Sequence, residues 1–429
     1  GDLCYSFDGE IYLWKGTEKK STRLPVMIRT EDPTSAVQHI RLSRGITEFD
    51  LSPTGKEIAF INRGEVFVTA VDHDLTKRVT DTPSQERSVS FSPDGRSLIY
   101  AGERDGSWNL YRTDLVRDEE PYFFGATLLK ESAILEIDEE TFQPTWSPDG
   151  KEVAYLQERV ELKVINLESG KTRTILPGDY NYSYADGDQY YDWSPDGKWF
   201  LVKFLSPERW SNEVGLIAAD GKGELVNLSR SGYEDNGPDW AMNGEMMIWH
   251  TDKNGLRDHG GWRTTGDIYG MFFTQKAWDK YHLTEAELAL AEALKSDDKK
   301  GKKGKGKKDA EKEEDEEDKD EDREERKYPD GFKPKEPVDE LEIDLEGIED
   351  RIARLTIHTS SIGDAVLSED GETLYYLARF EKGMDLWSYK HREDKIKLLA
   401  KLGARRVGGL TLDPEGKNLF LLADGSLRK

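Results

Sequence analysis

The densest group of side chains that could bind a metal or move a proton lies in residues 250–267, HTDKNGLRDHGGWRTTGD. It contains histidines and carboxylates, the side chains from which many zinc sites are built. Their spacing matches neither a helical nor a hairpin zinc site, and the glycines indicate a connection between strands. We therefore predict a solvent-exposed loop and no metal ligand among the five candidates, His250, Asp252, Asp258, His259 and Asp267.

A hydrolase of the nucleophilic type needs an activated nucleophile held beside a base. The sequence contains no G-x-S-x-G motif, no P-loop and no G-x-G-x-x-G between a strand and a helix. With one cysteine, Cys4, it has neither an internal disulfide framework nor a multi-thiolate metal site. We therefore predict no catalytic, cofactor-binding or metal-binding residue. The histidines lie in segments that we interpret as loops and insertions: His39, His73, His250, His259, His282, His358 and His391.

One phrase recurs along the chain: an apolar run, then Ser-Pro-Asp-Gly or a close variant, then a second apolar run. In a β-hairpin, proline fixes φ near about −65°, aspartate bonds to nearby backbone, and glycine adopts the positive φ that closes the turn. Calcium loops also combine aspartate with glycine, but they need several oxygen ligands at alternate positions. In each phrase one carboxylate stands nearly alone, which is too few ligands for calcium. We therefore predict turns at 49–61, 89–101, 144–156, 191–203, 238–250, 365–377 and 410–422.

Further strands follow each hairpin. A third strand begins with an acidic or amide residue followed by an aliphatic and usually an aromatic residue, as at 65–67 and 385–387. A fourth, more polar segment follows, as at 75–81. Four strands every 40 to 50 residues are typical of one propeller blade. We therefore predict an all-β fold, a seven-bladed β-propeller of four-stranded antiparallel blades over residues 1–429, with a helical and low-complexity insertion.

The two ends of the chain hold partial blades. Residues 1–28 supply a second, third and fourth strand, and residues 404–429 supply a first and a second strand. We predict that they complete one blade, because closure leaves only short, protected sheet edges. The alternative is that each partial blade belongs to its own unit, with the ring open or eight-membered. Because both ends fall within strand patterns, we expect this chain to be a piece of a longer polypeptide.

The repeat glycines Gly244 and Gly371 are 127 residues apart, whereas the other repeats follow at 40 to 55 residues. This interval holds an insertion, which we place at 284–350. Its first part has helical composition, with Thr284 as the N-cap and Glu287 completing a capping box. Residues 296–327 are a charged linker that buries too little apolar surface to offset its chain entropy, so we predict disorder there.

Composition limits the classes of partner. The formal net charge of −25 repels phosphate backbones, so we predict no nucleic-acid partner. No window of 18 consecutive apolar residues occurs, so we predict no membrane partner. Aromatic residues make up 10% of the chain. We expect most of the tryptophans to pack between sheets rather than to form a carbohydrate platform, including Trp210, Trp240, Trp249, Trp262 and Trp278.

The hairpins resemble the propeller repeats of TolB-like and tricorn-type proteins. Four more specific stretches, 45–68, 231–262, 267–287 and 364–387, resemble the second propeller of bacterial tricorn protease homologues. In that family a six-bladed propeller precedes a seven-bladed one, and a PDZ domain and a serine peptidase core follow. Its catalytic residues lie in those later domains, and no position here matches them.

This resemblance implies a non-catalytic propeller that filters or guides peptides or unfolded polypeptide to a protease core absent from this chain. It also implies downstream PDZ and peptidase domains, a possible homo-oligomer of the parent protein, and a cytoplasmic location, with the periplasm as the alternative. A different function is a free-standing TolB-like propeller that binds a protein partner. A third, the propeller of a prolyl-oligopeptidase-type enzyme, would require an α/β-hydrolase domain that this sequence lacks.

Deleting residues 296–327 should leave the midpoint of thermal unfolding nearly unchanged, because a polar disordered segment contributes little buried area. The comparison is with the unmodified chain, by calorimetry. A loss of several kcal/mol, which is on the scale of a whole domain's stability, would contradict the prediction.

Overall fold

The computed structural model describes most of the chain. No helix among the described residues is long and apolar enough to cross a membrane. The predicted disordered segment 296–327 lies outside the described residues, as do Asp258, His259 and Trp262. The chain divides into two units, Gly1–Ser43 and Arg44–Lys429. The described residues are 1–7, 10–25, 41–185, 187, 189–206, 210–257, 264–291, 293–294, 332 and 338–429.

The first unit contains one antiparallel sheet of three strands, β1 (Leu3–Phe7), β2 (Glu10–Lys15) and β3 (Lys20–Leu24). Every residue of β1 and β3 is exposed, and those of β2 are exposed or half-buried. Within this unit the sheet therefore lacks the buried faces that stabilise the strands of the second unit.

The second unit contains, in its described residues, seven antiparallel sheets, in which strands adjacent in sequence are adjacent in space. The first sheet comprises β4 (Ile46–Leu51), β5 (Glu57–Asn62), β6 (Glu65–Ala70) and β7 (Thr76–Arg78). The second comprises β8 (Glu86–Phe91), β9 (Ser97–Arg104), β10 (Ser107–Leu115) and β11 (Leu129–Leu135). The third comprises β12 (Thr141–Trp146), β13 (Glu152–Gln157), β14 (Glu161–Asn166) and β15 (Thr172–Leu176).

The remaining sheets follow the same order. The fourth comprises β16 (Tyr191–Trp193), β17 (Trp199–Leu205), β18 (Asn212–Ala218) and β19 (Val226–Asn227). The fifth comprises β20 (Asp235–Ala241), β21 (Met246–Thr251), β22 (Asp267–Phe272) and β23 (Ile352–Arg354). The sixth comprises β24 (Ser361–Leu367), β25 (Thr373–Arg379), β26 (Met384–Lys390) and β27 (Lys395–Ala404). The seventh has three strands, β28 (Val407–Leu412), β29 (Leu419–Ala423) and β30 (Ser426–Arg428). Short 3-10 turns lie at Phe123–Gly125, Gly178–Tyr180, Met242–Gly244 and Ile348–Asp350.

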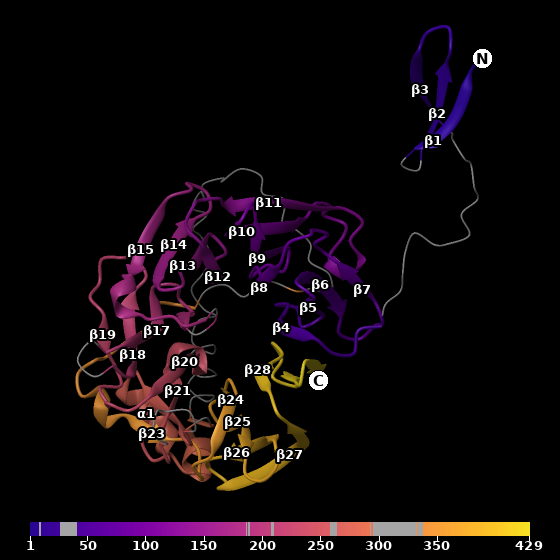
Figure 1. Ribbon diagram of the computed structural model, residues 1–429. Coiled ribbons are helices and arrows are strands. Elements are labelled where there is room, and N and C mark those ends of the chain that lie inside the picture. The colour runs from indigo at the N-terminus through magenta and orange to yellow at the C-terminus, as the bar shows by residue number, and fades with distance from the viewer. Residues whose placement is uncertain are drawn as a thin grey trace, which may run out of the picture. The chain divides into compact units, whose positions relative to one another are not determined.

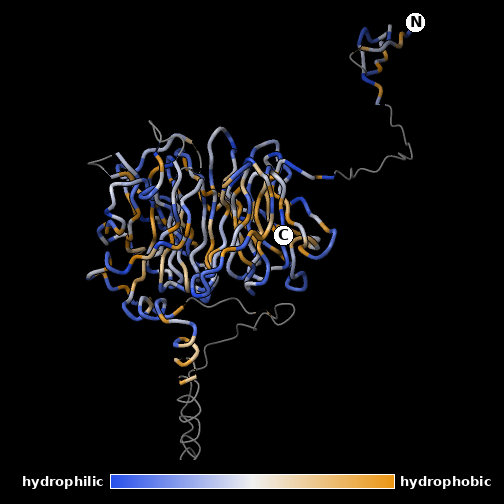
Figure 2. The backbone as a smooth tube through the Cα atoms, turned by 90° about the horizontal axis from the view of Figure 1, so that it is seen from below, coloured by the Kyte–Doolittle hydropathy of each residue, from blue (hydrophilic) through white to orange (hydrophobic). Residues whose placement is uncertain are grey.

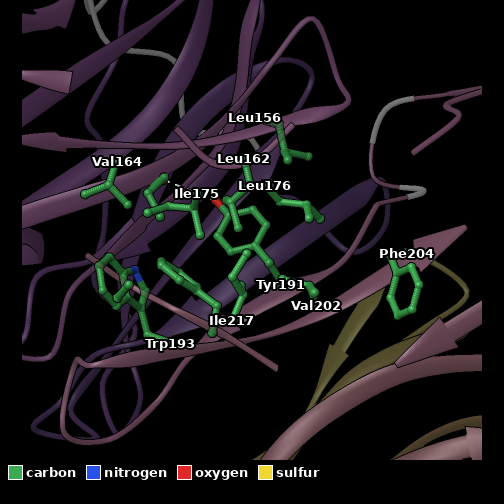
Figure 3. Close-up of a cluster of buried hydrophobic side chains, with 13 residues drawn as sticks. Leu156, Leu162, Val164, Ile175, Leu176, Tyr191, Trp193, Val202, Phe204 and Ile217 are labelled. Atoms are coloured by element: carbon green, nitrogen blue, oxygen red, sulfur yellow. Dashed lines mark hydrogen bonds between the residues drawn. The ribbon is translucent and has the colours of Figure 1, made fainter. Parts of the chain in front are cut away.

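Apolar side chains between consecutive sheets hold the second unit together. Six buried clusters each join one sheet to the next, from the first and second sheets to the sixth and seventh. Figure 3 shows the cluster between the third and fourth sheets, where Val164 and Ile175 face Tyr191 and Ile217. The second strands, such as β9 and β17, are mainly apolar, as expected where both faces of a sheet are covered. In Figure 2 hydrophobic residues accordingly follow the strands and hydrophilic residues the loops.

The predicted turns are confirmed. In the second repeat the Ser92 hydroxyl donates to Asp94 Oδ1 at 2.5 Å, and the same oxygen accepts the Arg96 amide at 3.0 Å. Gly95 closes the turn with φ +70°, a value that favours glycine. The same serine–aspartate bond recurs at Ser147, Ser194 and Ser368.

The turns also contact one another across sheets. A Cβ placed on Gly95, Gly150 or Gly197 would lie 3.6 to 3.7 Å from the Cδ of the proline in the preceding sheet's turn. A Cβ placed on Gly55, in the first sheet, would lie 3.2 Å from Cδ of Pro414, in the seventh. The proline–glycine contact that joins the turns of the first four sheets is therefore also made between the last sheet and the first.

Two polar contacts join the same pair of sheets. The Ile46 amide donates to the Gly425 carbonyl at 3.1 Å, and Lys429 Nζ lies 3.3 Å from Asp72 Oδ1. In Figure 1 the first strands β4, β8, β12, β20, β24 and β28 lie toward a common centre, with β7, β11, β15, β19, β23 and β27 outside.

The strand order bears on the partial blades at the two ends. The strands of residues 1–28 pair with one another, as do those of 404–429, in separate sheets. The pairing of each set is described within its own unit. That residues 1–28 complete the blade of 404–429 stays a prediction.

The long interval between repeats separates the third and fourth strands of the fifth sheet, since β22 pairs with β23 across it. Helix α1 (Gln275–His282) follows β22 and begins at Thr274, whose hydroxyl oxygen accepts the Ala277 amide. The predicted capping box is present: Glu287 Oε2 accepts the Thr284 amide at 2.8 Å, and Thr284 Oγ1 accepts the Glu287 amide at 3.3 Å.

The chain shortened to residues 44–429 should unfold in one cooperative transition at the midpoint of the parent, because its seven sheets contact one another without residues 1–43. Thermal unfolding followed by circular dichroism, together with size-exclusion chromatography, measures this. Aggregation or loss of cooperativity would instead support the prediction that residues 1–28 complete the last blade.

Candidate functional site

Six of the seven described first strands share an irregularity, a shift in register against the second strand. Ser88, Gln143 and Gly237 have φ of +56°, +50° and +55°. Such register shifts are β-bulges, in which one strand has an extra residue and the nearby side chains change direction. They lie between Ile46 and Glu48, Arg87 and Ser90, Phe142 and Thr145, Asn236 and Asp239, Ile362 and Asp364, and Gly408 and Thr411.

At these bulges backbone amides of one sheet donate to carboxylates of the preceding sheet. The Ser88 amide donates to Glu48 Oε1 at 2.8 Å. The Leu410 amide donates to Asp364 Oδ2, also at 2.8 Å. The carboxylates thus link sheets as well as line the inner strands.

Acidic residues occupy a repeated position on these strands. Asp50, Asp192 and Asp239 each lie two residues before the first residue of the turn in their repeat. Burial raises the pKa of Asp50 to about 6, although the hydrogen bond from the Phe91 amide acts in the opposite direction. Burial also raises the pKa of Asp192, Asp239 and Asp364.

These side chains combine two properties that rarely coincide. Asp192, Asp239 and Asp364 keep part of their surface accessible. Their pKa values are nevertheless raised mainly by loss of hydration. An accessible carboxylate surrounded by protein lines a narrow space rather than an open surface.

Tyr190 connects two of the acidic strands. Its hydroxyl donates to Asp239 Oδ1, from the fourth sheet to the fifth. Trp240 Nε1 donates back to the Asp192 carbonyl at 3.4 Å. After burial, the charge of Asp192 is the next cause of the raised pKa of Asp239. Neighbouring first strands therefore bring acidic side chains together, and repulsion by Asp192 helps to raise the pKa of Asp239.

A cavity of about 230 Å³ lies between the first strands of the fifth and sixth sheets. Asp239 and Asp364 line it from β20 and β24, and His250 lines it from β21. Burial lowers the pKa of His250 despite the charges of Asp252 and Asp267, so its imidazole is neutral near pH 7. Apolar residues, including Ile248, Trp249 and Ile362, form the rest of the wall.

The loop predicted for 250–267 is wrong for three of its five candidates. His250 lies in β21 and Asp267 begins β22, where it is fully buried, and Asp252 is 3% exposed. Strands β21 and β22 thus extend into the predicted loop at both ends, and Asp252, directly after β21, is buried as well.

Two of the buried carboxylates have partners of their own. Asp252 binds Arg257 through two hydrogen bonds of 2.7 and 2.9 Å. Asp267 accepts hydrogen bonds from Arg354 and Thr356, both at 2.8 Å. Within the described ranges, no group of three His, Cys, Asp or Glu side chains is arranged to hold a metal ion.

A second cavity, of about 320 Å³, lies between the sixth and seventh sheets. Arg44, Lys401 and Arg428 line it together with Asp424. The amides of Arg406 and Arg405 lower the pKa of Asp424, so this carboxylate stays ionised beside the basic side chains. Its charges are thus partly compensated, unlike those of the first cavity.

Sequence reasoning missed the acidic positions. Asp192 and Asp239 interrupt apolar first strands at one fixed distance from the turn, and that recurrence was the available signal. The expected packing role holds for Trp240, Trp249 and Trp278, which lie in or against buried clusters. It is wrong for Trp210, which is 64% exposed because its contacts are with Tyr182 on a surface connection.

No protein-family model matches the chain. In sequence, it is similar to a tricorn protease homologue of Saccharolobus solfataricus, 23% identical over 265 residues, which are 58% of this chain and 21% of that protein. It is also 31% identical over 129 residues to dipeptidyl-peptidase 5 of Porphyromonas gingivalis, over 26% of this chain and 16% of that protein. The chain thus spans about a fifth or less of these relatives.

The fold is similar to that of the tricorn protease crystal structure, with a TM-score of 0.58 and 13% identity, over 99% of this chain and 37% of that one. The predicted tricorn-like resemblance is confirmed. A hydrazine synthase chain of Kuenenia stuttgartiensis matches with a TM-score of 0.50 and 13% identity, over 92% of this chain and 98% of that one. These likenesses support a propeller domain built of antiparallel sheets.

Replacing Asp239 with asparagine should stabilise the protein, and more at pH 8 than at pH 5. A carboxyl whose pKa is raised on folding favours the folded state below its ordinary value of 3.8, and that stability is lost as pH rises through the folded-state pKa. The asparagine side chain does not ionise, so the variant avoids this loss and its free energy of unfolding at pH 8 should be higher by about 1 to 3 kcal/mol. Urea unfolding at both pH values measures the gain, with Asp220→Asn, an exposed carboxylate, as control. An equal gain at the two pH values would contradict the prediction.

Proposed function

We propose that this chain is a non-catalytic propeller of a tricorn-like serine peptidase, which receives extended polypeptide and guides it to a peptidase core outside this chain. The observation that carries the proposal is the sequence similarity to a tricorn protease homologue over 58% of the chain. The likeness in fold to the tricorn protease supports the same architecture.

The proposal includes closure of Arg44–Lys429 as a ring of seven blades. Seven consecutive sheets and the contacts between the seventh and the first support it. Closure shields most sheet edges, so the accessible backbone and the acidic side chains of β16, β20 and β24 face the centre. An extended polypeptide presents amide donors and cationic groups to such a surface.

The net charge of −25 favours cationic or neutral chains over polyanions. Through the tricorn resemblance we also propose PDZ and peptidase domains as partners within the parent protein, assembly of that parent as a homo-oligomer, and a cytoplasmic location.

The purified chain should not hydrolyse fluorogenic peptides, and it should bind an unfolded polypeptide in preference to the folded form. Fluorescence anisotropy with labelled lysozyme, a basic protein, measures this preference. The reduced chain, with its cysteines blocked as neutral carboxamidomethyl groups, is compared with native lysozyme as the control of matched charge. We expect binding at least 10-fold tighter for the unfolded form. Turnover that co-purifies with the chain, or equal binding of both forms, would contradict the proposal.

The parent gene distinguishes this function from a free-standing module. A PDZ domain and peptidase core encoded after Lys429 would support the proposed function. A stop codon at that point would support a TolB-like interaction module, and a G-x-S-x-G domain a prolyl-oligopeptidase-type enzyme.

A further inference from the structure

The cavity between β20 and β24 has the build of a binding site. Its polar side chains come from three strands of two sheets: Asn236 and Asp239 from β20, His250 from β21 and Asp364 from β24. Its remaining wall includes Ile248 and Trp249, so the polar groups act in surroundings with little water. Pockets that bind ligands typically combine an apolar lining with a few placed polar groups.

The two carboxylates lack counter-charges within the described part of the chain. Asp239 accepts the Tyr190 hydroxyl, and Asp364 accepts backbone amides of Leu410 and Ala365. No lysine or arginine is among the causes of their pKa shifts, and Asp192 adds further negative charge beside Asp239. An ionised carboxylate without a partner is costly here, and the pKa of Asp239 is accordingly raised to about 8. A bound cation would supply the counter-charge that keeps this carboxyl ionised.

The third polar group suits the same ligand. His250 carries a neutral imidazole, which has one nitrogen that accepts a hydrogen bond. A primary ammonium has three N–H donors, and two carboxylates with one imidazole offer three acceptors. Glycine at 266 preserves this arrangement, because a Cβ there would lie 2.5 Å from His250 Nε2.

Size excludes larger ligands. Pockets for drug-sized ligands and cofactors are about 300–1,000 Å³, and this cavity is about 230 Å³. Its acidic and histidine side chains do not form a metal-holding group among the described residues. A side-chain-sized organic cation is the remaining fit.

We propose that the cavity between β20 and β24 binds a primary ammonium group on a short aliphatic chain, with Asp239, Asp364 and His250 as its acceptors. The lysine side chain and the amino terminus of a polypeptide share this chemistry. The inference rests on the proposed function, since it names the group of a polypeptide that the first strands recognise.

Titration with n-butylammonium, followed by ligand-observed NMR, tests the site in the full chain. We expect saturable binding with a Kd of about a millimolar, as for a single charged group. Asp239→Asn and Asp364→Asn should each weaken it at least 10-fold. Asp50→Asn, a half-buried carboxylate at the same repeat position as Asp239 but outside the cavity, should leave it unchanged.

A second measurement needs no variant. Butan-1-ol, the neutral analogue, should fail to displace n-butylammonium from the unmodified chain. Equal displacement by the alcohol, an equal loss of affinity in Asp50→Asn, or no saturable binding would each overturn the proposal.

The source of the ammonium follows from two small probes, N-acetyl-lysine methylamide and glycine methylamide. Binding of the first shows a lysine site, and binding of the second an amino-terminal site. Saturable n-butylammonium binding without any binding of unfolded polypeptide would leave the cavity assignment standing and reject the proposed function. Binding of unfolded polypeptide without binding of n-butylammonium would support the proposed function and reject the cavity assignment.

Discussion

The whole second unit depends on one constraint: each sheet has two apolar faces, and each face needs another sheet against it. The buried clusters between consecutive sheets meet this requirement six times. Between the last sheet and the first, Pro414 and Gly55 repeat the contact that proline and glycine make elsewhere. Because sheets packed face to face in this way twist relative to one another, their first strands converge on a common centre.

That convergence explains the chemistry of the candidate site. A carboxylate on a first strand is accessible yet crowded by neighbouring strands, so it loses hydration that a surface residue keeps. Asp50 compensates by accepting the Phe91 amide at 2.7 Å, whereas Asp239 faces the charge of Asp192. The same position in the repeat therefore serves as a structural link in one sheet and as an uncompensated charge in another.

Local chemistry was predictable from sequence, and long-range placement was not. The turn at Asp94–Gly95 and the capping box at Thr284 follow from residues a few positions apart, and both were predicted. The glycines that follow His250 predict a loop, yet its cross-strand pairing with Asn236 and Ile268 puts it in a strand. Asp239 and Asp364 are 125 residues apart, so only the packing of two sheets brings them to one cavity.

Closure of the ring is the claim on which the proposed function depends, and the Ile46 amide reports on it directly. This amide donates to the Gly425 carbonyl, from the first sheet to the last. In hydrogen–deuterium exchange, we expect strong protection of Ile46 in the full chain and its selective loss when residues 425–429 are removed. Rapid exchange of Ile46 in the full chain, beside protected amides in β5, would contradict a closed ring.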